Sequence, residues 1–128
     1  VKVFQFDGLQ GICDVANHWG ADLFVSIHCN AATGSARGTE TYCARYAQEG
    51  RRLAEYINAQ IVNSIKSGYR YWNRGAKEAG YYVLVHTDMP AVLVETAFID
   101  NDEDARLLIE QEDEFARAIA RGVTDYCQ

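Results

Sequence analysis

Two side chains that could carry out hydrolysis stand next to apolar segments of this 128-residue chain. His28 follows the apolar segment 24–27 and ends the first predicted strand, and Glu95 follows the apolar segment 92–94 and ends the fourth. A carboxylate buried beside such a segment is costly unless it is paired or bound to a metal. Because ligand sites of open α/β sheets form outside the carboxyl ends of strands, we expect both residues at one cleft. A zinc hydrolase needs three protein ligands and a carboxylate base, and the sequence supplies one imidazole and one base of this set.

The other reactive residues support competing or weaker interpretations. A hydrogen-bonded histidine at a sheet edge remains an alternative role for His28. His18 is predicted near a helix end, where histidines commonly balance the helix dipole, and His86 at a strand end that could line the same cleft. Cys29 cannot be a nucleophile activated by its neighbour, because successive side chains of a strand point to opposite faces. The sequence also lacks a GxSxG elbow, a P-loop and a glycine-rich dinucleotide turn.

Composition and charge narrow the class of protein. Hydrophobic residues make up 48% of the chain and charged residues 23%, which is typical of a globular protein, and the length suits one domain over residues 1–128. The net charge of -6 argues against nucleic acid as a partner, because phosphate neutralisation requires clustered Lys and Arg. The only candidate for a local basic patch is RGAKEAGYY, residues 74–82. No apolar run has the length of a transmembrane helix, and we expect a monomer.

The cysteines leave the redox state open. Their spacing includes no CxxC motif, which excludes a zinc ribbon or a thioredoxin-like centre. Their even number permits two disulfides by three connectivities, and free thiols buried in an α/β core are the alternative. The four residues are Cys13, Cys29, Cys43 and Cys127.

The elements that must position the candidate residues are predicted from hydrophobic periodicity. Spacing of three and four residues predicts a helix from Asp7, as its N-cap, to His18, and another helix over Glu49–Lys66. The β-rich segment Leu23–Ile27 is predicted to be a central strand that is covered on both faces. Period-two alternation predicts a second strand over residues 39–44.

The carboxyl-terminal half is predicted to contain both strands and helices. The apolar runs YYVLVH (81–86) and AVLVETAF (91–98) are predicted as strands, and Pro90 marks the start of the second. Asn101 is predicted to cap the segment DEDARLLI, and apolar spacing predicts a helix over Glu112–Tyr126. Helices that alternate with strands through short links indicate an α/β layered domain.

Several segments together resemble a known enzyme family. They are ANHWGADLFVSIHCNAA, GTETYC and RGAKEAGYYVLVHTDMPAVLVETAFIDNDEDARLL, in this order, and they span nearly all of the chain. They resemble the catalytic domain of zinc-dependent (type 3) N-acetylmuramoyl-L-alanine amidases, which cleave peptidoglycan between the muramic acid lactyl group and the stem peptide. The segments SIHxNA and PAVLVExxFIxN are specific in combination.

The resemblance implies roles for individual residues. His28 would be a ligand of one zinc ion (Zn²⁺), and Glu95 would be the catalytic carboxylate that activates the attacking water. Supporting or substrate-binding positions are implied for Asn30, Glu40, Arg74 and Gly75. The resemblance also implies peptidoglycan as the partner, action in the cell envelope or outside the cell, and a phosphorylase/hydrolase-like α/β fold. In that fold a twisted, mostly parallel sheet has helices on both faces, and its first strand and helix would be absent from this chain.

The resemblance is incomplete on the amino-terminal side. Members of the family begin with a strand and a GHGG-like segment that carries the first zinc ligand, and a later glutamate is the second ligand; this sequence contains neither segment. Ile12 stands where an arginine is usual, and Ala97 where a glycine is common. Three interpretations stay open: a piece of a longer amidase, a chain completed by another chain, or a non-catalytic remnant that binds wall fragments or a partner. A host remodelling enzyme and a phage lysin are equally compatible with the sequence.

Overall fold

Helices and four strands form an α/β fold in the computed structural model, which describes residues 1–68 and 71–128. The elements are α1 (Leu9–Trp19), β1 (Phe24–Asn30), β2 (Thr39–Cys43), α2 (Gln48–Ser64), β3 (Asn73–Glu78), α3 (Tyr82–Val85), β4 (Ala91–Phe98), α4 (Asp102–Glu110) and α5 (Glu112–Cys127). Over the described residues the strand order is β1-β4-β2-β3. The pairs β1–β4 and β2–β3 are parallel and the pair β2–β4 is antiparallel. The predicted α/β fold with a mostly parallel sheet is therefore confirmed.

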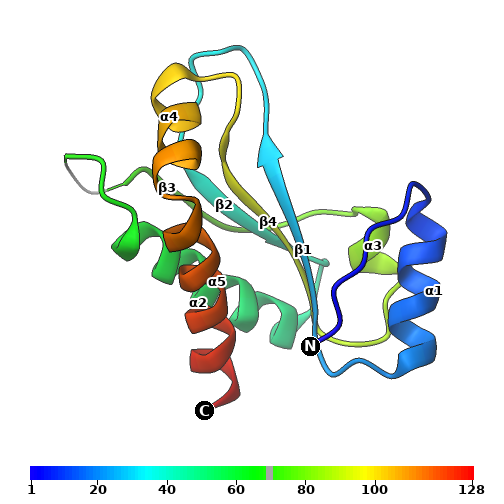
Figure 1. The fold of residues 1–128 in the computed structure, drawn as a ribbon. Helices are drawn as coiled ribbons and strands as arrows, with labels where there is room; N and C mark the ends of the chain where they lie inside the picture. The colour runs from blue at the N-terminus through cyan, green and yellow to red at the C-terminus, as the bar shows by residue number, and fades with distance from the viewer. Residues whose placement is uncertain (69–70) are drawn as a thin grey trace.

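Helices cover both faces of the sheet, as Figure 1 shows. On one face, α2 and α5 pack over a core that includes Leu53, Ile57 and Val94, each of them fully buried. On the other face, α1 and α3 cover a smaller core that includes Phe24 and Leu93. Each large apolar side chain removed from water contributes roughly 1.5–3 kcal/mol, so these two cores hold the sheet between its helices.

Strand β4 is covered on both faces. Val92 and Val94 belong to the core under α2 and α5, and Ala91 and Leu93 belong to the core under α1 and α3. The sequence predicted this position for the strand that holds Ile27, and that prediction is wrong. Strand β1 stands at one end of the strand order, and Ile27 is 59% exposed. Apolar composition alone thus assigned an edge strand to the centre of the sheet.

The segments on either side of residue 80 also differ from the prediction. Residues 82–85 of YYVLVH form the short helix α3, in which the backbone N–H of His86 donates to the carbonyl of Tyr82. Residues 73–78 form the strand β3, although NRGAKE has no apolar alternation. Because β3 lies at the other end of the strand order, backbone pairing with β2 is enough to hold it and its side chains need not be apolar.

The helical predictions are largely confirmed. Helices α2 and α5 occupy the predicted stretches, and the Asn101 side chain accepts a hydrogen bond from the backbone N–H of Asp104 as a helix cap. Helix α1 begins after Gly8 without a side-chain cap, so the predicted cap at Asp7 is wrong. All four cysteines are free thiols. Within the described residues, no helix has both the length and the apolar character that a membrane span requires.

Candidate active site

A row of four residues crosses the sheet from β1 to β3, and we call it the transverse row. The strand register pairs His28 with Glu95, Glu95 with Glu40, and Glu40 with Gly75. Residues that are directly paired across strands present their side chains to the same face of a sheet. Leu93, two residues before Glu95, packs in the core under α1 and α3, so the transverse row lies on that face of the sheet.

The position of Glu95 in its strand differs from the prediction. Residues 96–98 continue β4 beyond Glu95, so this carboxylate lies within the strand rather than at its end. Strand β1 likewise continues beyond His28 to Asn30, so the predicted strand end at His28 is also wrong. The pairing register of β1 and β4 shifts between His28 and Asn30, directly after the His28–Glu95 pair. The irregularity interrupts the regular ladder beside the two residues, a position at which β-bulges commonly re-aim side chains.

Two buried threonines fix the backbone of the transverse row. The Thr96 hydroxyl donates to the carbonyl oxygen of His28 at 3.0 Å, and the Thr39 hydroxyl donates to the carbonyl oxygen of Glu95 at 3.1 Å. Both threonine residues are at most 4% exposed. The Thr96 bond therefore joins β4 to β1 at His28, and the Thr39 bond joins β2 to β4 at Glu95.

His28 is an exposed side chain on the edge strand. Its Nε2 atom lies 2.8 Å from the hydroxyl oxygen of Ser26, which is two residues earlier and therefore on the same face. This geometry is compatible with a metal ligand oriented by a hydroxyl group and also with a hydrogen-bonded histidine at a sheet edge. The direction of the side chain toward the face that carries Glu95 favours the first interpretation.

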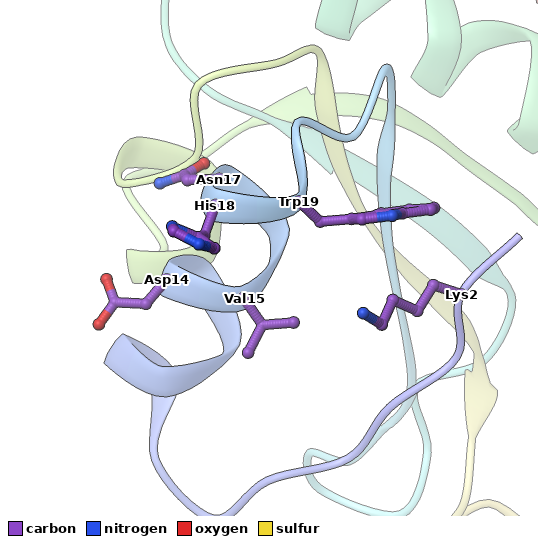
Figure 2. Close-up of a pocket in the computed structure, with 6 residues that line it drawn as sticks. All are labelled: Lys2, Asp14, Val15, Asn17, His18 and Trp19. Atoms are coloured by element: carbon purple, nitrogen blue, oxygen red, sulfur yellow. The ribbon is translucent and has the colours of Figure 1, made fainter.

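The other two histidines lie on different elements. His18, in the last turn of α1, lines a hollow between that helix and the amino-terminal segment, where Lys2 lies 5.5 Å from the ring centroid of Trp19 (Figure 2). His86, at the end of α3, stacks on Tyr82 with ring centroids 3.9 Å apart. The structure does not join either residue to His28 in a group that could hold a metal ion within residues 1–68 and 71–128.

Glu95 has a partly buried carboxylate with few polar neighbours. Its Oε2 atom is buried and has no hydrogen-bond partner among the described residues. Burial raises the pKa of the Glu95 carboxyl, and the negative charge of Glu40 on the neighbouring strand raises it further. A carboxylate whose proton affinity is increased in this way is a better acceptor for a proton from water than an ordinary surface glutamate.

Glu40 has the opposite environment, although it is the cross-strand partner of Glu95. Only 3% of the residue is exposed, and its carboxylate accepts four hydrogen bonds. The donors are Asn30 Nδ2 at 3.2 Å and Tyr42 OH at 2.5 Å to Oε1, and Arg74 Nε and Lys77 Nζ, both at 2.8 Å, to Oε2. Burial opposes ionisation, but the hydrogen bonds and the charge of Lys77 outweigh it and lower the pKa of Glu40 to about 2.

A bulge in β3 determines the positions of Arg74 and Gly75. The register with β2 shifts between Thr39 and Glu40, so that Arg74 is an additional residue on β3. Gly75 has a φ of 87°, a left-handed conformation that costs other residues roughly 1–2 kcal/mol. The bulge turns the Arg74 side chain to the face that carries Glu40.

Two residues that contact Glu40 were not predicted from the sequence. Tyr42 and Lys77 are cross-strand partners, and both contact the Glu40 carboxylate. The alternation of GTETYC places Tyr42 on the same face as Glu40, which is a usable signal. Lys77 could not be found in this way, because its strand has no hydrophobic alternation from which to predict it.

The described residues provide only part of a zinc site. His28 is a suitable nitrogen ligand, but Glu40 is already saturated by its four donors. No group of three or more histidine, cysteine, aspartate or glutamate side chains that could hold a metal ion occurs over residues 1–68 and 71–128. The donor set therefore fits one ligand of a three-ligand zinc site and not the complete site.

Comparisons of the sequence with a family profile and with individual proteins agree on one family. The profile described as N-acetylmuramoyl-L-alanine amidase matches residues 5–125. The uncharacterized protein YqiI of Bacillus subtilis is 43% identical over 110 residues, which cover 83% of this chain and 52% of that protein. The N-acetylmuramoyl-L-alanine amidase LytC of the same organism is 41% identical over 126 residues, which cover 94% of this chain and 25% of LytC. The chain thus spans about half or less of these relatives.

Comparison of the fold agrees with the sequence matches. The crystal structure of an N-acetylmuramoyl-L-alanine amidase from Clostridium difficile 630 is similar with a TM-score of 0.87 and 31% identity. The match covers 96% of this chain and 67% of that chain. The amidase AmiC2 of Nostoc punctiforme is similar with a TM-score of 0.86 and 37% identity, over 97% of this chain and 68% of AmiC2.

Proposed function

The chain belongs to the N-acetylmuramoyl-L-alanine amidase family, and from this premise we propose that it carries the general base and one zinc ligand of a peptidoglycan hydrolase. The bond to be cleaved is the amide between N-acetylmuramic acid and the L-alanine of the stem peptide. The base is Glu95 and the ligand is His28. Such a substrate implies that the protein acts in the cell envelope or outside the cell.

The observation that carries this proposal is the contrast between Glu95 and its surroundings. A carboxylate with a buried, unpartnered oxygen and a raised pKa stands beside the single imidazole of the transverse row. An unsatisfied buried carboxylate oxygen costs stability, and such a cost is typical of a functional site. No such argument applies to Glu40, whose oxygens are all paired.

In the proposed reaction Glu95 moves the protons. It accepts a proton from the water that attacks the amide carbonyl and then donates this proton to the leaving nitrogen, because an amide does not expel an unprotonated amine. Members of this family depend on zinc, which supplies Lewis-acid polarisation when it is bound. Because His28 is one ligand of three, the proposal requires further ligands from outside the described residues.

The incomplete ligand set favours a second candidate function. On this alternative the chain binds wall fragments without cleaving them, since the described residues alone form no metal site. The two functions differ in one observable. A hydrolase releases stem peptides from purified peptidoglycan, whereas a binding module sediments with the wall and releases none.

The test is the substitution Glu95→Gln in the longest natural form of the protein. It keeps the shape of the side chain and removes the base, so we expect peptide release to fall by about 100-fold or more while the bound zinc is retained. Glu110→Gln, which makes the same charge change at an exposed position of α4, is the matched control and should leave release unchanged. Unchanged turnover in Glu95→Gln, with zinc present in both proteins, would refute the role of Glu95.

A further inference from the structure

Two cations of β3 border the transverse row and are only partly buried. Arg74 and Lys77 have side chains that are 32% and 41% exposed, and both contact the same oxygen of Glu40. They belong to RGAKEAGYY, the only candidate for a basic patch in a chain whose net charge is -6. The reaction proposed for Glu95 and His28 does not use them.

The charges of the cluster formed by Glu40, Arg74 and Lys77 do not cancel. Glu40 contributes one negative charge, because its pKa of about 2 keeps it ionised, and the two cations contribute one positive charge each. The cluster therefore carries one net positive charge at neutral pH. A single cation is enough to neutralise Glu40, so the second can balance a further anionic group, either the Glu95 carboxylate on the neighbouring strand or a ligand.

The donors of the two cations are also not exhausted by Glu40. The contact of Arg74 uses Nε, and the guanidinium group has further N–H bonds on its two Nη atoms. The ammonium group of Lys77 has three N–H bonds, and one contact to Glu40 oxygen is formed. The Glu40 carboxylate already accepts four hydrogen bonds, so the remaining donors of these partly exposed side chains are available to water or to the acceptor atoms of a ligand.

Neighbouring residues hold the Arg74 guanidinium in place. Asn73 Oδ1 accepts a hydrogen bond from the backbone N–H of Gly75 at 2.8 Å and another from Asn58 Nδ2 of α2 at 2.7 Å. These bonds tie the bulge to a buried residue, since Asn58 is 4% exposed. The guanidinium carbon lies 4.9 Å from the ring centroid of Phe98, a cation–π distance. Arg74 is thus preorganised, which reduces the entropy lost when a ligand binds.

We propose that Arg74 and Lys77 form a binding site for a carboxylate group on the peptide part of the substrate. The proposal rests on the proposed function and names a recognition element of the same site. A guanidinium fork next to an ammonium group is well suited to a carboxylate. The carboxylate would bind on the β3 side of the row, and the scissile amide would lie toward Glu95.

The experiment compares two small ligands that differ in one charge. One is a muramoyl dipeptide with a free terminal carboxylate, and the other is its carboxamide. Binding of each to the protein is measured by isothermal titration calorimetry. The wild-type protein should bind the acid about fivefold more tightly than the amide, because an exposed ionic contact is worth only a modest factor.

Three variants sharpen the experiment. Lys77→Met should reduce the acid-to-amide affinity ratio to about one, and Arg74→Lys should reduce it partly, because the charge remains and the fork is lost. Lys66→Met removes the same charge from an exposed residue beyond the end of α2 and should keep the wild-type ratio. Thermal unfolding of each variant establishes that the protein is folded, and the ratio is a readout that a purely structural role would not move.

The outcomes separate this proposal from the proposed function. Equal affinity for acid and amide in the wild-type protein, binding of neither ligand, or an acid preference that survives in Lys77→Met overturns the carboxylate site. Because the measurement needs no turnover, an acid preference lost in Lys77→Met supports the site even if peptide release is never observed. Peptide release with equal affinities would leave the amidase function intact and refute this site alone.

Discussion

Each half of the transverse row contains one carboxylate, and the two carboxylates lie in contrasting environments. On the β2–β3 half, Glu40 is saturated by four donors and its pKa is lowered to about 2. On the β1–β4 half, Glu95 has a buried oxygen without a partner among the described residues, and its pKa is raised. The two residues are direct cross-strand partners. Their shared position in the sheet therefore does not decide their properties; the hydrogen-bond donors around each carboxylate do.

This contrast indicates a division of labour. The outer strand β3 supplies Arg74 and Lys77, which fix one carboxylate as a permanent anion. The outer strand β1 supplies His28, whose contact is with Ser26 rather than with Glu95. Pairs of titratable groups with pKa values pushed apart commonly mark different chemical roles. We infer that Glu40 organises the site and that Glu95 exchanges protons, and we expect substitutions of the two residues to affect stability differently.

The largest expected effect is that of Glu40→Gln. The substitution leaves Arg74 and Lys77 without their anion and places an amide donor beside them, so the free energy of unfolding should fall by about 2–3 kcal/mol. This loss is smaller than the loss expected when one partner of a fully buried ion pair is removed, because both cations are partly exposed. Urea unfolding at neutral pH measures it. A loss below about 0.5 kcal/mol, similar to that expected for the exposed control Glu110→Gln, would contradict the structural role of Glu40.

The same variant gives a prediction about pH. Because the pKa of Glu40 is lowered from its ordinary 4.5 to about 2, its ionised form stabilises the folded state above pH 4.5, and this contribution is lost as the pH falls toward 2. The difference in stability between the wild-type protein and Glu40→Gln should therefore be largest near neutral pH and shrink below pH 4.5. Urea unfolding of both proteins over this range checks the sign. A difference that grows on acidification would be the opposite of what the paired carboxylate predicts.

A smaller effect is expected from Gly75→Ala, which strains the bulge that orients Arg74. A Cβ atom at Gly75 meets no other atom within 4 Å, so the cost comes from the φ of 87° alone and should be about 1–2 kcal/mol. Gly80→Ala, in equally open space but without a positive φ, is the matched control and should change stability by less than about 0.5 kcal/mol. Equal effects of both substitutions in thermal unfolding would show that the bulge is not strained.

The local features of the fold could be predicted from the sequence. The long helices α2 and α5 follow from apolar spacing and the cap of α4 from Asn101, because each signal lies within one element. The strand β2 was likewise predicted from its alternation. In contrast, YYVLVH was predicted as a strand and forms α3, since a short apolar run does not distinguish a strand from a buried helix.

The features that depend on pairing between distant segments could not be predicted. The edge position of β1 depends on the strand order, and the sequence of residues 23–27 contains no information about its neighbours. The strand β3 has a polar sequence and exists because β2 pairs with it. The site shows the same limit: His28 and Glu95 were singled out by their local context, whereas the contacts of Lys77 with Glu40 join residues that are 37 positions apart.

The smallest expected effect on stability is that of Glu95→Gln, and it completes the comparison. Burial and the neighbouring Glu40 both disfavour the ionised carboxyl in the folded protein, so removal of the charge should leave stability unchanged or raise it by up to about 1 kcal/mol at neutral pH. Urea unfolding of Glu95→Gln and Glu40→Gln in parallel measures the contrast directly. A loss in Glu95→Gln as large as that in Glu40→Gln would mean that both carboxylates have structural partners, and the assignment of proton transfer to Glu95 would lose its physical basis. A gain together with lost peptide release would instead identify a residue that the protein keeps at the expense of its own stability.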